Sequence, residues 1–532
     1  MRVLLALLLL VMLGCERQSR IDQANAENRL VLSNRVEPED LDPQVTTGVA
    51  EINIHMALFE GLTSPDPRTL EPEPGVAESW EISEDGRTYT FHLRKNAHWS
   101  NGEALTAKDF IYSWKRILNP KLGAANAVLL FVIEGAESYH AGVIDWDQVG
   151  IKALDAYTLQ IRLNAPTGYF PNLLMHPAFY PVYEPAIDAK DGTERRGSGW
   201  TRPGYHVGNG PFKLQDWQPN QIVRVVKNEN YWDADVVNLS AIDFLPYENA
   251  TTEETAFLGQ QIHLTRTLPP AKIAGYREKN SPYLRIDPYL GTYYYLINTK
   301  ASPLDNPLVR KALAYSLDKQ TIISRVLNGG EQPARAFTPP DTAGYTSEAG
   351  IDYNLEEARK ALAEAGYANG AGFPTLTLKF NSSDNNRVLA EVVQEMWRKN
   401  LGIPVELQNE EWKSYLETRR QGDFEILRAS WIGDYVDPMT FLELWKTDNQ
   451  NNFSGFSDPD YDILIDEAAR SQNSERRRAL LEDAEQLLLE STPIIPLYHF
   501  TTPYLIRPEV RGWYPTLLDW HPYKYVYLES PQ

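Results

Sequence analysis

Alternating apolar and polar positions predict strands in several parts of the chain. Residues 88–94 place every second side chain on one apolar face, which is the pattern of a half-buried strand. The Asp85-Gly86 dipeptide just before this run is a hairpin signal. Residues 154–163 repeat the same unit of a turn followed by an alternating strand, and short apolar runs predict further strands at residues 30–32 and 291–298.

Helical periodicity appears behind recognisable caps. Thr106 with Asp109 three residues later forms a capping-box pattern, and apolar residues follow at helical spacing. Asn354 caps a second predicted helix, which Gly366 ends. From there to the C-terminus helices and strands alternate, and this predicts an α/β sheet with helices on its faces. The strands of this region are expected at residues 376–380, 405–407, 424–427 and 494–500, and the helices at 389–402, 412–419 and 462–490.

One stretch of this alternating region, residues 428–438, combines charges suited to a binding site. It follows the strand predicted at 424–427, and Pro438 prevents the ladder from continuing. A carboxylate at such a strand exit, here Asp434, points toward the crevice where open α/β sheets bind ligands. Arg428 and Asp434 have opposite charges with Trp431 between them, which suits a zwitterionic ligand. An ordinary strand end with a structural ion pair is the alternative.

The N-terminus has the pattern of an exported protein. Met1-Arg2 is followed by an apolar run over residues 3–13, which is too short to span a bilayer and is typical of a signal peptide covering residues 1–14. Cys15 is the only cysteine, so no internal disulfide is possible. Its position resembles a bacterial lipobox, with Met12 in place of the usual leucine. We expect acylation of Cys15 and a polar tether through residues 15–29, the alternative being a cysteine discarded with the signal.

Composition narrows the function only in part. The net charge of −21 argues against a nucleic-acid role, because neutralising phosphates requires clustered Lys and Arg. The mature chain is long enough for two to four domains at roughly 100–200 residues each. An acidic chain rich in Tyr and Trp fits a secreted binding protein, and equally a polysaccharide-degrading enzyme.

Catalytic and metal-binding motifs are not found. The nine histidines are scattered, without the i, i+4 spacing of a helical zinc site, and there is no Gly-x-Ser-x-Gly elbow. The Gly-rich turn at residues 208–212 lacks the Lys-Ser/Thr of a phosphate loop. Glu410-Glu411 is the obvious carboxylate pair, but adjacent side chains point in different directions, so a solvated face is favoured. Counting carboxylates alone does not exclude a hydrolase that uses two of them. We therefore favour a binding protein without a cofactor over an enzyme.

Beyond these patterns, the segment from Arg428 to Asp434, followed by Tyr435, Asp437-Pro438 and Phe441-Leu442, resembles the ligand-site segment of oligopeptide-binding proteins. These are the receptors of peptide ABC importers, the family 5 solute-binding proteins. Residues 77–116 are similar to the defining pattern of that family, and the resemblance runs from about residue 30 to the C-terminus. It implies an α/β fold of the periplasmic-binding-protein type II, with two lobes, an additional inserted domain and a hinge between the lobes.

The resemblance also implies the domain organisation. Domain I is expected to be discontinuous, comprising residues 30–60, 206–290 and 502–532. Domain II, residues 61–205, is inserted early in the chain. Domain III comprises residues 291–501 and contains the α/β alternation.

The site residues are carried over from the resemblance position by position. Asp434 would meet the peptide α-ammonium, Ser430 and Val49 would pair with the peptide backbone, and Arg428 and Arg419 would face its C-terminal carboxylate. If the resemblance to the family is set aside, the sequence fits a core valine at position 49 equally well. The other implied residues are Trp412 and Trp431 as walls of side-chain pockets, Tyr498 near the site, and Asn386 where some relatives have a histidine that takes the carboxylate of one peptide length.

The expected function follows from these roles. The chain would be an extracytoplasmic or periplasmic receptor that binds short oligopeptides by their backbone and terminal charges. Its partners would be the permease and ATPase subunits of an ABC importer, and the membrane through the lipid on Cys15; we expect a monomer. The same fold serving dipeptides, murein peptide, haem or a nickel complex is one alternative, and a secreted hydrolase is another.

Overall fold

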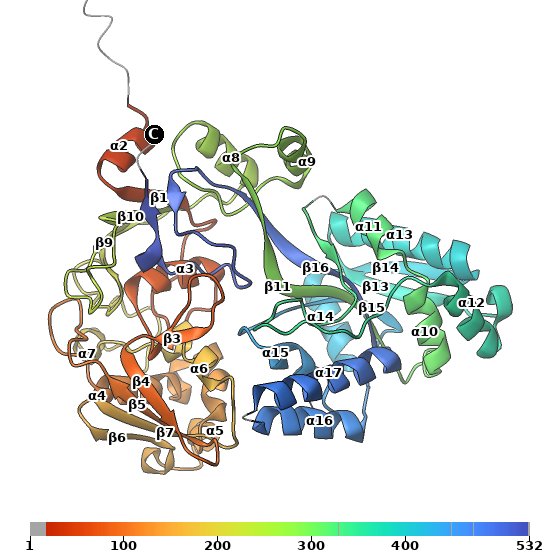
Figure 1. Ribbon diagram of the computed structural model, residues 1–532, viewed down its shortest axis with the longest axis horizontal. Helices are drawn as coiled ribbons and strands as arrows, with labels where there is room; N and C mark the ends of the chain where they lie inside the picture. The colour runs from red at the N-terminus through yellow and green to blue at the C-terminus, as the bar shows by residue number, and fades with distance from the viewer. Residues whose placement is uncertain (1–17, 328, 448, 472, 530–532) are drawn as a thin grey trace, which may run out of the picture.

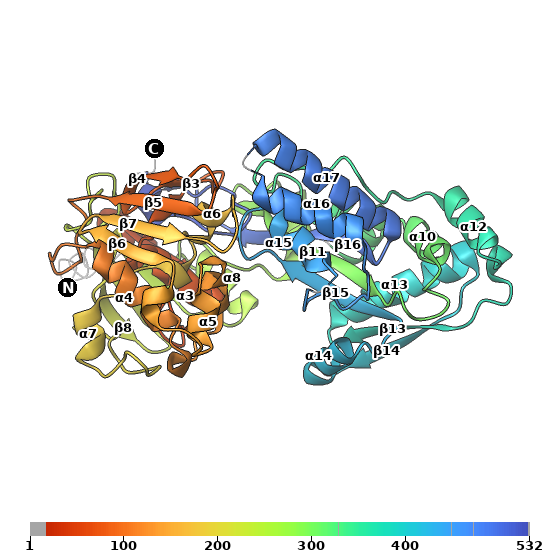
Figure 2. The same ribbon diagram turned by 90° about the horizontal axis from the view of Figure 1, so that it is seen from below.

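Two lobes joined by a pair of long strands make up the molecule (Figures 1 and 2). The computed structural model describes residues 18–529 except 328, 448 and 472. The connecting strands are β11 (Leu284–Ile297) and β16 (Ile494–Leu505), which pair antiparallel along most of their length. Among the described residues, no helix combines the length and apolar character needed to cross a bilayer.

The first lobe contains a four-stranded sheet built from distant segments. Its order is β1-β10-β9-β8, and β1 runs parallel to β10, so that residues 29–33 lie against residues 241–245. Every residue of these two strands is buried, as expected for a parallel pair covered on both faces. The elements of this part are β1 (Arg29–Ser33), α3 (Val49–Leu58), β8 (Phe212–Gln218), β9 (Ile222–Lys227), β10 (Ala241–Leu245), α8 (Ala250–Leu258), α9 (Pro270–Glu278), β17 (Val510–Arg511) and β18 (Tyr527–Leu528).

A second sheet of the same lobe, β4-β5-β7-β6, is antiparallel throughout. Burial in β5 alternates residue by residue, which confirms the half-buried strand predicted there. The capping box that opens α4 is also confirmed, because the carboxylate of Asp109 accepts hydrogen bonds from the N–H (2.7 Å) and hydroxyl (2.9 Å) of Thr106. The elements are β2 (Thr63–Pro65), β3 (Pro72–Pro74), β4 (Ala77–Ile82), β5 (Thr88–Leu93), α4 (Ala107–Ile117), α5 (Ala136–His140), β6 (Ile151–Asp155), β7 (Thr158–Arg162), α6 (Phe170–Leu173) and α7 (Glu184–Asp188).

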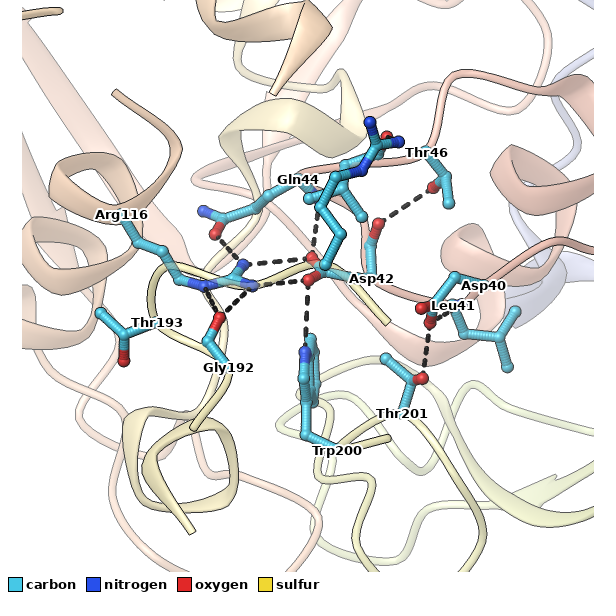
Figure 3. A network of polar contacts seen from close by, with 12 residues as sticks. Asp40, Leu41, Asp42, Gln44, Thr46, Arg116, Gly192, Thr193, Trp200 and Thr201 are labelled. Carbon is cyan, nitrogen blue, oxygen red and sulfur yellow. Dashed lines mark hydrogen bonds and ion pairs between the residues drawn. The ribbon is translucent and has the colours of Figure 1, made fainter. Parts of the chain in front are cut away.

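A buried ion pair joins these two parts of the first lobe (Figure 3). Asp42, from the segment after β1, accepts from the Nη2 of Arg116 on α4 at 2.7 Å, and both side chains are almost fully buried. Gln44, Trp200 and the carbonyl of Gly192 complete the hydrogen bonding around the pair. Because all these groups are satisfied, the network holds the two parts in one orientation.

The second lobe carries a six-stranded mixed sheet of order β12-β16-β11-β15-β13-β14. The predicted alternation of helices and strands is confirmed, although the helix expected at 462–490 is two helices, α16, which ends at Arg470, and α17, which begins at Ser474. The strands not yet given are β12 (Gln332–Pro333), β13 (Leu376–Asn381), β14 (Val405–Glu410) and β15 (Ile426–Ile432), and the helices are α10 (Pro307–Tyr315), α11 (Lys319–Val326), α12 (Leu355–Glu364), α13 (Asp384–Leu401), α14 (Trp412–Gln421), α15 (Met439–Leu442), α16 (Pro459–Arg470) and α17 (Ser474–Ser491).

The length of β15 differs from the sequence prediction. The strand does not end at residue 427 but continues to Ile432, because each residue from 426 to 432 pairs with β11. Residues 428–431 therefore lie within a strand and not in a loop. Only Asp434 lies beyond the strand end, as expected.

The N-terminal tether is also different from the expectation. Cys15 lies outside the described residues, but residues 20–26 form helix α2 (Arg20–Ala26) and are not an extended tether. Ser19 and Asp22 form a capping box, and Ile21 and Ala24 are buried on one face of the helix. This cap and the i, i+3 apolar pair favour a docked helix in a segment whose overall composition is polar.

Candidate ligand-binding site

A cavity of about 390 Å³ lies between the lobes beside the two crossing strands. Val49, the first residue of α3, lines it from the first lobe, and Ile432, the last residue of β15, lines it from the second. Phe500 on β16 adds a wall. Val49 is 41% exposed, so the alternative of a core valine is wrong.

Alternate residues of strand β15 share one face, and the last of them, Ile432, lines this cavity. Arg428, Ser430 and Ile432 share one face because side chains alternate along a strand, and all three are at least partly exposed. Trp431 lies on the other face with the buried Ala429, and its Nε1 atom is buried without a hydrogen-bond partner. The exposed face of β15 is thus a row of ligand-accessible positions that leads toward Asp434.

Asp434 lies two residues beyond the end of β15. Its N–H donates to the hydroxyl of Thr440 at 3.1 Å, which fixes the backbone, and the residue is exposed two positions after Ile432, which lines the cavity. Although solvent reaches it, the surrounding protein desolvates the carboxyl group and raises its pKa. No basic side chain of the described residues forms an ion pair with it, so the alternative of a structural Arg428–Asp434 pair is not observed. A carboxylate placed in this way suits a cation supplied by a ligand.

The two arginines expected at the opposite end converge on Tyr415. This tyrosine donates to the carbonyl of Arg428 at 2.6 Å, and the guanidinium groups of both Arg428 and Arg419 act to lower its pKa, which desolvation nevertheless raises. Each arginine has a buried Nε without a hydrogen-bond partner, and within the described residues neither forms an ion pair with an acid. Their charges are therefore available to an anionic group.

Tyr293 organises the surroundings of Arg428. The guanidinium of Arg428 lies 4.6 Å from the centroid of the Tyr293 ring, and the tyrosine hydroxyl donates to Asn386 Oδ1 at 3.2 Å. Asn386 also donates to both oxygens of Asn381 at 3.1 Å, and Asn381 accepts from Arg428 at 3.4 Å. Tyr498 stacks on Tyr293 with the ring centroids 4.9 Å apart. Three expected site residues, Arg428, Asn386 and Tyr498, are thus part of one cluster.

Two members of this cluster, Tyr293 and Asn381, were not identified as site residues from the sequence. Asn381 ends strand β13, and a polar residue at a strand end next to a predicted site is a signal that was available. Tyr293 lies in the predicted strand at 291–298, but periodicity alone does not distinguish it from a core residue. Of the remaining expectations, Trp412 begins α14, and its side chain lies outside the described part of the chain.

Glu410, expected on a solvated face, has a largely buried side chain. Glu410 lies 3.6 Å from Lys379, and both side chains are nearly buried, which is typical of a structural ion pair. Within the part of the chain that the structure describes, no group of three His, Cys, Asp or Glu side chains could hold a metal ion. Beyond Leu427, β15 pairs with β11 but not with β13, so its second edge can take a ligand backbone between the charges of Arg428 and Asp434.

Comparisons with known proteins agree with this architecture. The model of "Bacterial extracellular solute-binding proteins, family 5 Middle" matches residues 71–453, well over half of the chain. The periplasmic murein peptide-binding protein MppA of Escherichia coli is 37% identical over 92% of this chain and 90% of its own length. The periplasmic oligopeptide-binding protein OppA of Salmonella typhimurium is also 37% identical, over 91% of this chain and 89% of its own.

Solved structures of other proteins have the same two-lobed arrangement. The unliganded open form of the murein tripeptide-binding protein MppA matches with a TM-score of 0.86 at 36% identity, covering 94% of this chain and 97% of that one. The accessible cleft between the lobes agrees with an open state. The fold is the two-lobed type II fold of periplasmic binding proteins, as the sequence predicted, and the chain belongs to the family 5 bacterial extracellular solute-binding proteins.

Proposed function

We propose that this protein is an extracytoplasmic receptor that binds short peptides between its lobes and delivers them to an ABC importer. One observation carries the proposal: Asp434 has no basic partner, and Arg428 and Arg419 have no acidic partner, among the residues that the structure describes. Asp434 lies six positions after Arg428, which corresponds to at most about 20 Å of extended chain. A peptide of three to five residues, with an ammonium and a carboxylate at its ends, fits that span.

The middle of the ligand would be recognised through its backbone. Ser430 lies on the exposed face of β15, and Val49 lies across the cavity from Ile432. A peptide lying between them would pair like an added strand, which gives affinity without regard to side-chain identity. Trp412 would contribute to a side-chain pocket, with Tyr498 and Asn386 holding the carboxylate end in place. Trp431, which packs against the core on the opposite face of β15, would support the strand beneath the ligand.

Closure of the lobes would complete the site. The pairing of β11 with β16 is irregular between Pro288 and Thr292, where the strands pass between the lobes. An interrupted ladder bends more readily than a regular one, and hinges absorb backbone change at a few such positions. Closure would remove Asp434 and Arg428 from water and strengthen their interaction with the ligand charges.

The cellular setting is inferred from the chain and its relatives. A lipid on Cys15 would attach the protein to the membrane in the periplasm or at an extracytoplasmic surface, and we expect a monomer that works without catalysis. The parallel pairing of β1 with β10 supports the discontinuous domain I, and the separate sheet β4-β5-β7-β6 supports the inserted domain II. Domain III would comprise the six-stranded sheet and its helices.

Mass spectrometry of ligands released from the purified protein tests the proposal. Peptides of mixed sequence, mostly three to five residues long, are the expected result. A single murein-derived peptide would indicate a specialised receptor, an alternative supported by the murein peptide-binding relative. Recovery of a haem or nickel complex, or failure to bind any tri- to pentapeptide in calorimetry, would contradict the function.

A further inference from the structure

The turn after β1 holds an arginine in an unusual backbone conformation. Arg35 has φ of 63°, in the left-handed region that favours glycine. Such strained positions persist only where the surrounding structure fixes them, and they cluster at ligand clamps. The structure supplies that fixation, because the N–H of Arg35 donates to the hydroxyl of Ser33 at 3.2 Å.

A second arginine holds the side chain in place. The Nη2 of Arg35 donates to the carbonyl of Arg266 at 3.0 Å. Arg266 in turn pairs with Asp519 at 2.7 Å, and Asp519 lies 3.0 Å from the ring of His521. Asp519 is therefore engaged by Arg266 and His521. The second acid of this group, Glu253, accepts from the N–H groups of Arg266 and Thr267.

Two acids, Asp519 and Glu253, oppose the charge of Arg35 without forming an ion pair with it. The Nε of Arg35 is buried without a hydrogen-bond partner, and in the described part of the chain no acidic side chain forms an ion pair with it. Burial, followed by repulsion from Arg266, lowers its pKa by more than Asp519 and Glu253 raise it. An anion beside this guanidinium would relieve both effects.

Arg35 faces the ligand cleft and not a separate surface. It lines the 390 Å³ cavity together with Val49 and Ile432. The charged lining residues are Arg35, Arg266 and Asp519, which leaves one positive charge in a protein whose net charge is −21. Ile432 lies two residues before Asp434, about 7 Å along the chain, which corresponds to the second residue of an extended peptide whose ammonium meets Asp434.

We propose that Arg35 is a specificity-determining residue that binds a carboxylate side chain at the second position of the peptide. The inference rests on the proposed function, because it uses the peptide direction set by Asp434. A guanidinium held by one nitrogen keeps the rest of its planar fork available, and this fork matches a carboxylate in a way that a lysine ammonium does not. The receptor is thereby general for the peptide backbone but prefers an acid at one place.

Calorimetry with matched tripeptides tests this assignment. The wild-type protein should bind Ala-Glu-Ala at least about tenfold more tightly than the isosteric Ala-Gln-Ala, since the pair adds a charge-assisted hydrogen bond. Ala-Ala-Glu serves as a position control, and its affinity should not depend on Arg35. In Arg35→Gln the ratio between the first two peptides should fall to about one, and Arg35→Lys should restore only part of it.

The control variant removes an arginine elsewhere in the same lobe. Arg285 is exposed and donates to backbone carbonyls outside the cavity, so Arg285→Gln should keep the full preference. If the wild type binds both peptides equally, the role of Arg35 is wrong while the proposed function stands. If it binds neither, the function itself fails. The wild-type comparison decides the question even if the Arg35 variants do not fold.

Discussion

Replacing Asp434 by asparagine tests the basis of ligand recognition. The change keeps the shape of the side chain but removes the only charge proposed to meet the peptide ammonium. At about 4 Å and an effective dielectric constant of about 20, this attraction amounts to roughly 4 kcal/mol. Removing one partner of a charge pair that closure buries costs about 2–5 kcal/mol, because the remaining charge is left unpaired, and we expect a loss in this range. The dissociation constant should rise by a factor between about thirty and several thousand.

Calorimetry in a double-mutant design isolates this interaction. The wild-type protein and Asp434→Asn are each titrated with a tripeptide and with its N-acetylated form. Acetylation should cost the wild type about as much as the mutation does, and should cost the variant little, since both changes remove the same pair. Affinity should also fall as the pH drops through the raised pKa of Asp434, because the protonated group no longer attracts an ammonium. If acetylation leaves wild-type affinity unchanged, the assignment of Asp434 is refuted.

Three further predictions concern other charged groups. Arg428→Gln should weaken binding of peptides with a free C-terminal carboxylate by about tenfold or more but spare their amides, and equal losses in calorimetry would contradict its role. Arg116→Met leaves a buried aspartate unpaired and should lower the free energy of unfolding in urea by about 3–5 kcal/mol, against at most about 1 kcal/mol for Arg162→Met at an exposed pair. Burial raises the pKa of Glu443 to about 7 in the folded protein. The protonated carboxyl group therefore stabilises the fold fully at pH values below the pKa that Glu443 has in the unfolded chain, and this stabilisation is lost as the pH rises through 7. Glu443→Gln should remove about 3 kcal/mol of that dependence, seen in thermal unfolding at pH 5 and 8.

Local patterns predicted the elements but not their ends. The capping box at Thr106 and the alternation in β5 were readable because they depend on residues a few positions apart. The end of β15 was misplaced because its last residues are held by pairing with β11, more than 130 residues earlier in the chain. Helix α2 was missed because a polar composition concealed its cap and two buried apolar residues.

Candidate site residues could be named from the sequence, but their grouping could not. The opposite charges of Arg428 and Asp434 were visible, and the resemblance to a family gave them roles. The sequence could not show that they remain unpaired with each other. Nor could it show that Arg35 lines the cavity between the lobes, because no motif in the neighbouring sequence marks this arginine as a ligand-binding residue.

The sequence by itself determined the α/β class, the capped helix starts at Thr106 and Asn354, the export pattern at the N-terminus and the candidate residues for a peptide site. The tertiary structure decided which of them act together. Tyr293 reaches Tyr498 only because β11 pairs with β16 across some 200 residues, and Val49 reaches Ile432 only because two lobes face each other. The physical reason is range: periodicity and caps report interactions within a few residues, whereas a cleft between lobes depends on contacts between segments that are distant in the chain.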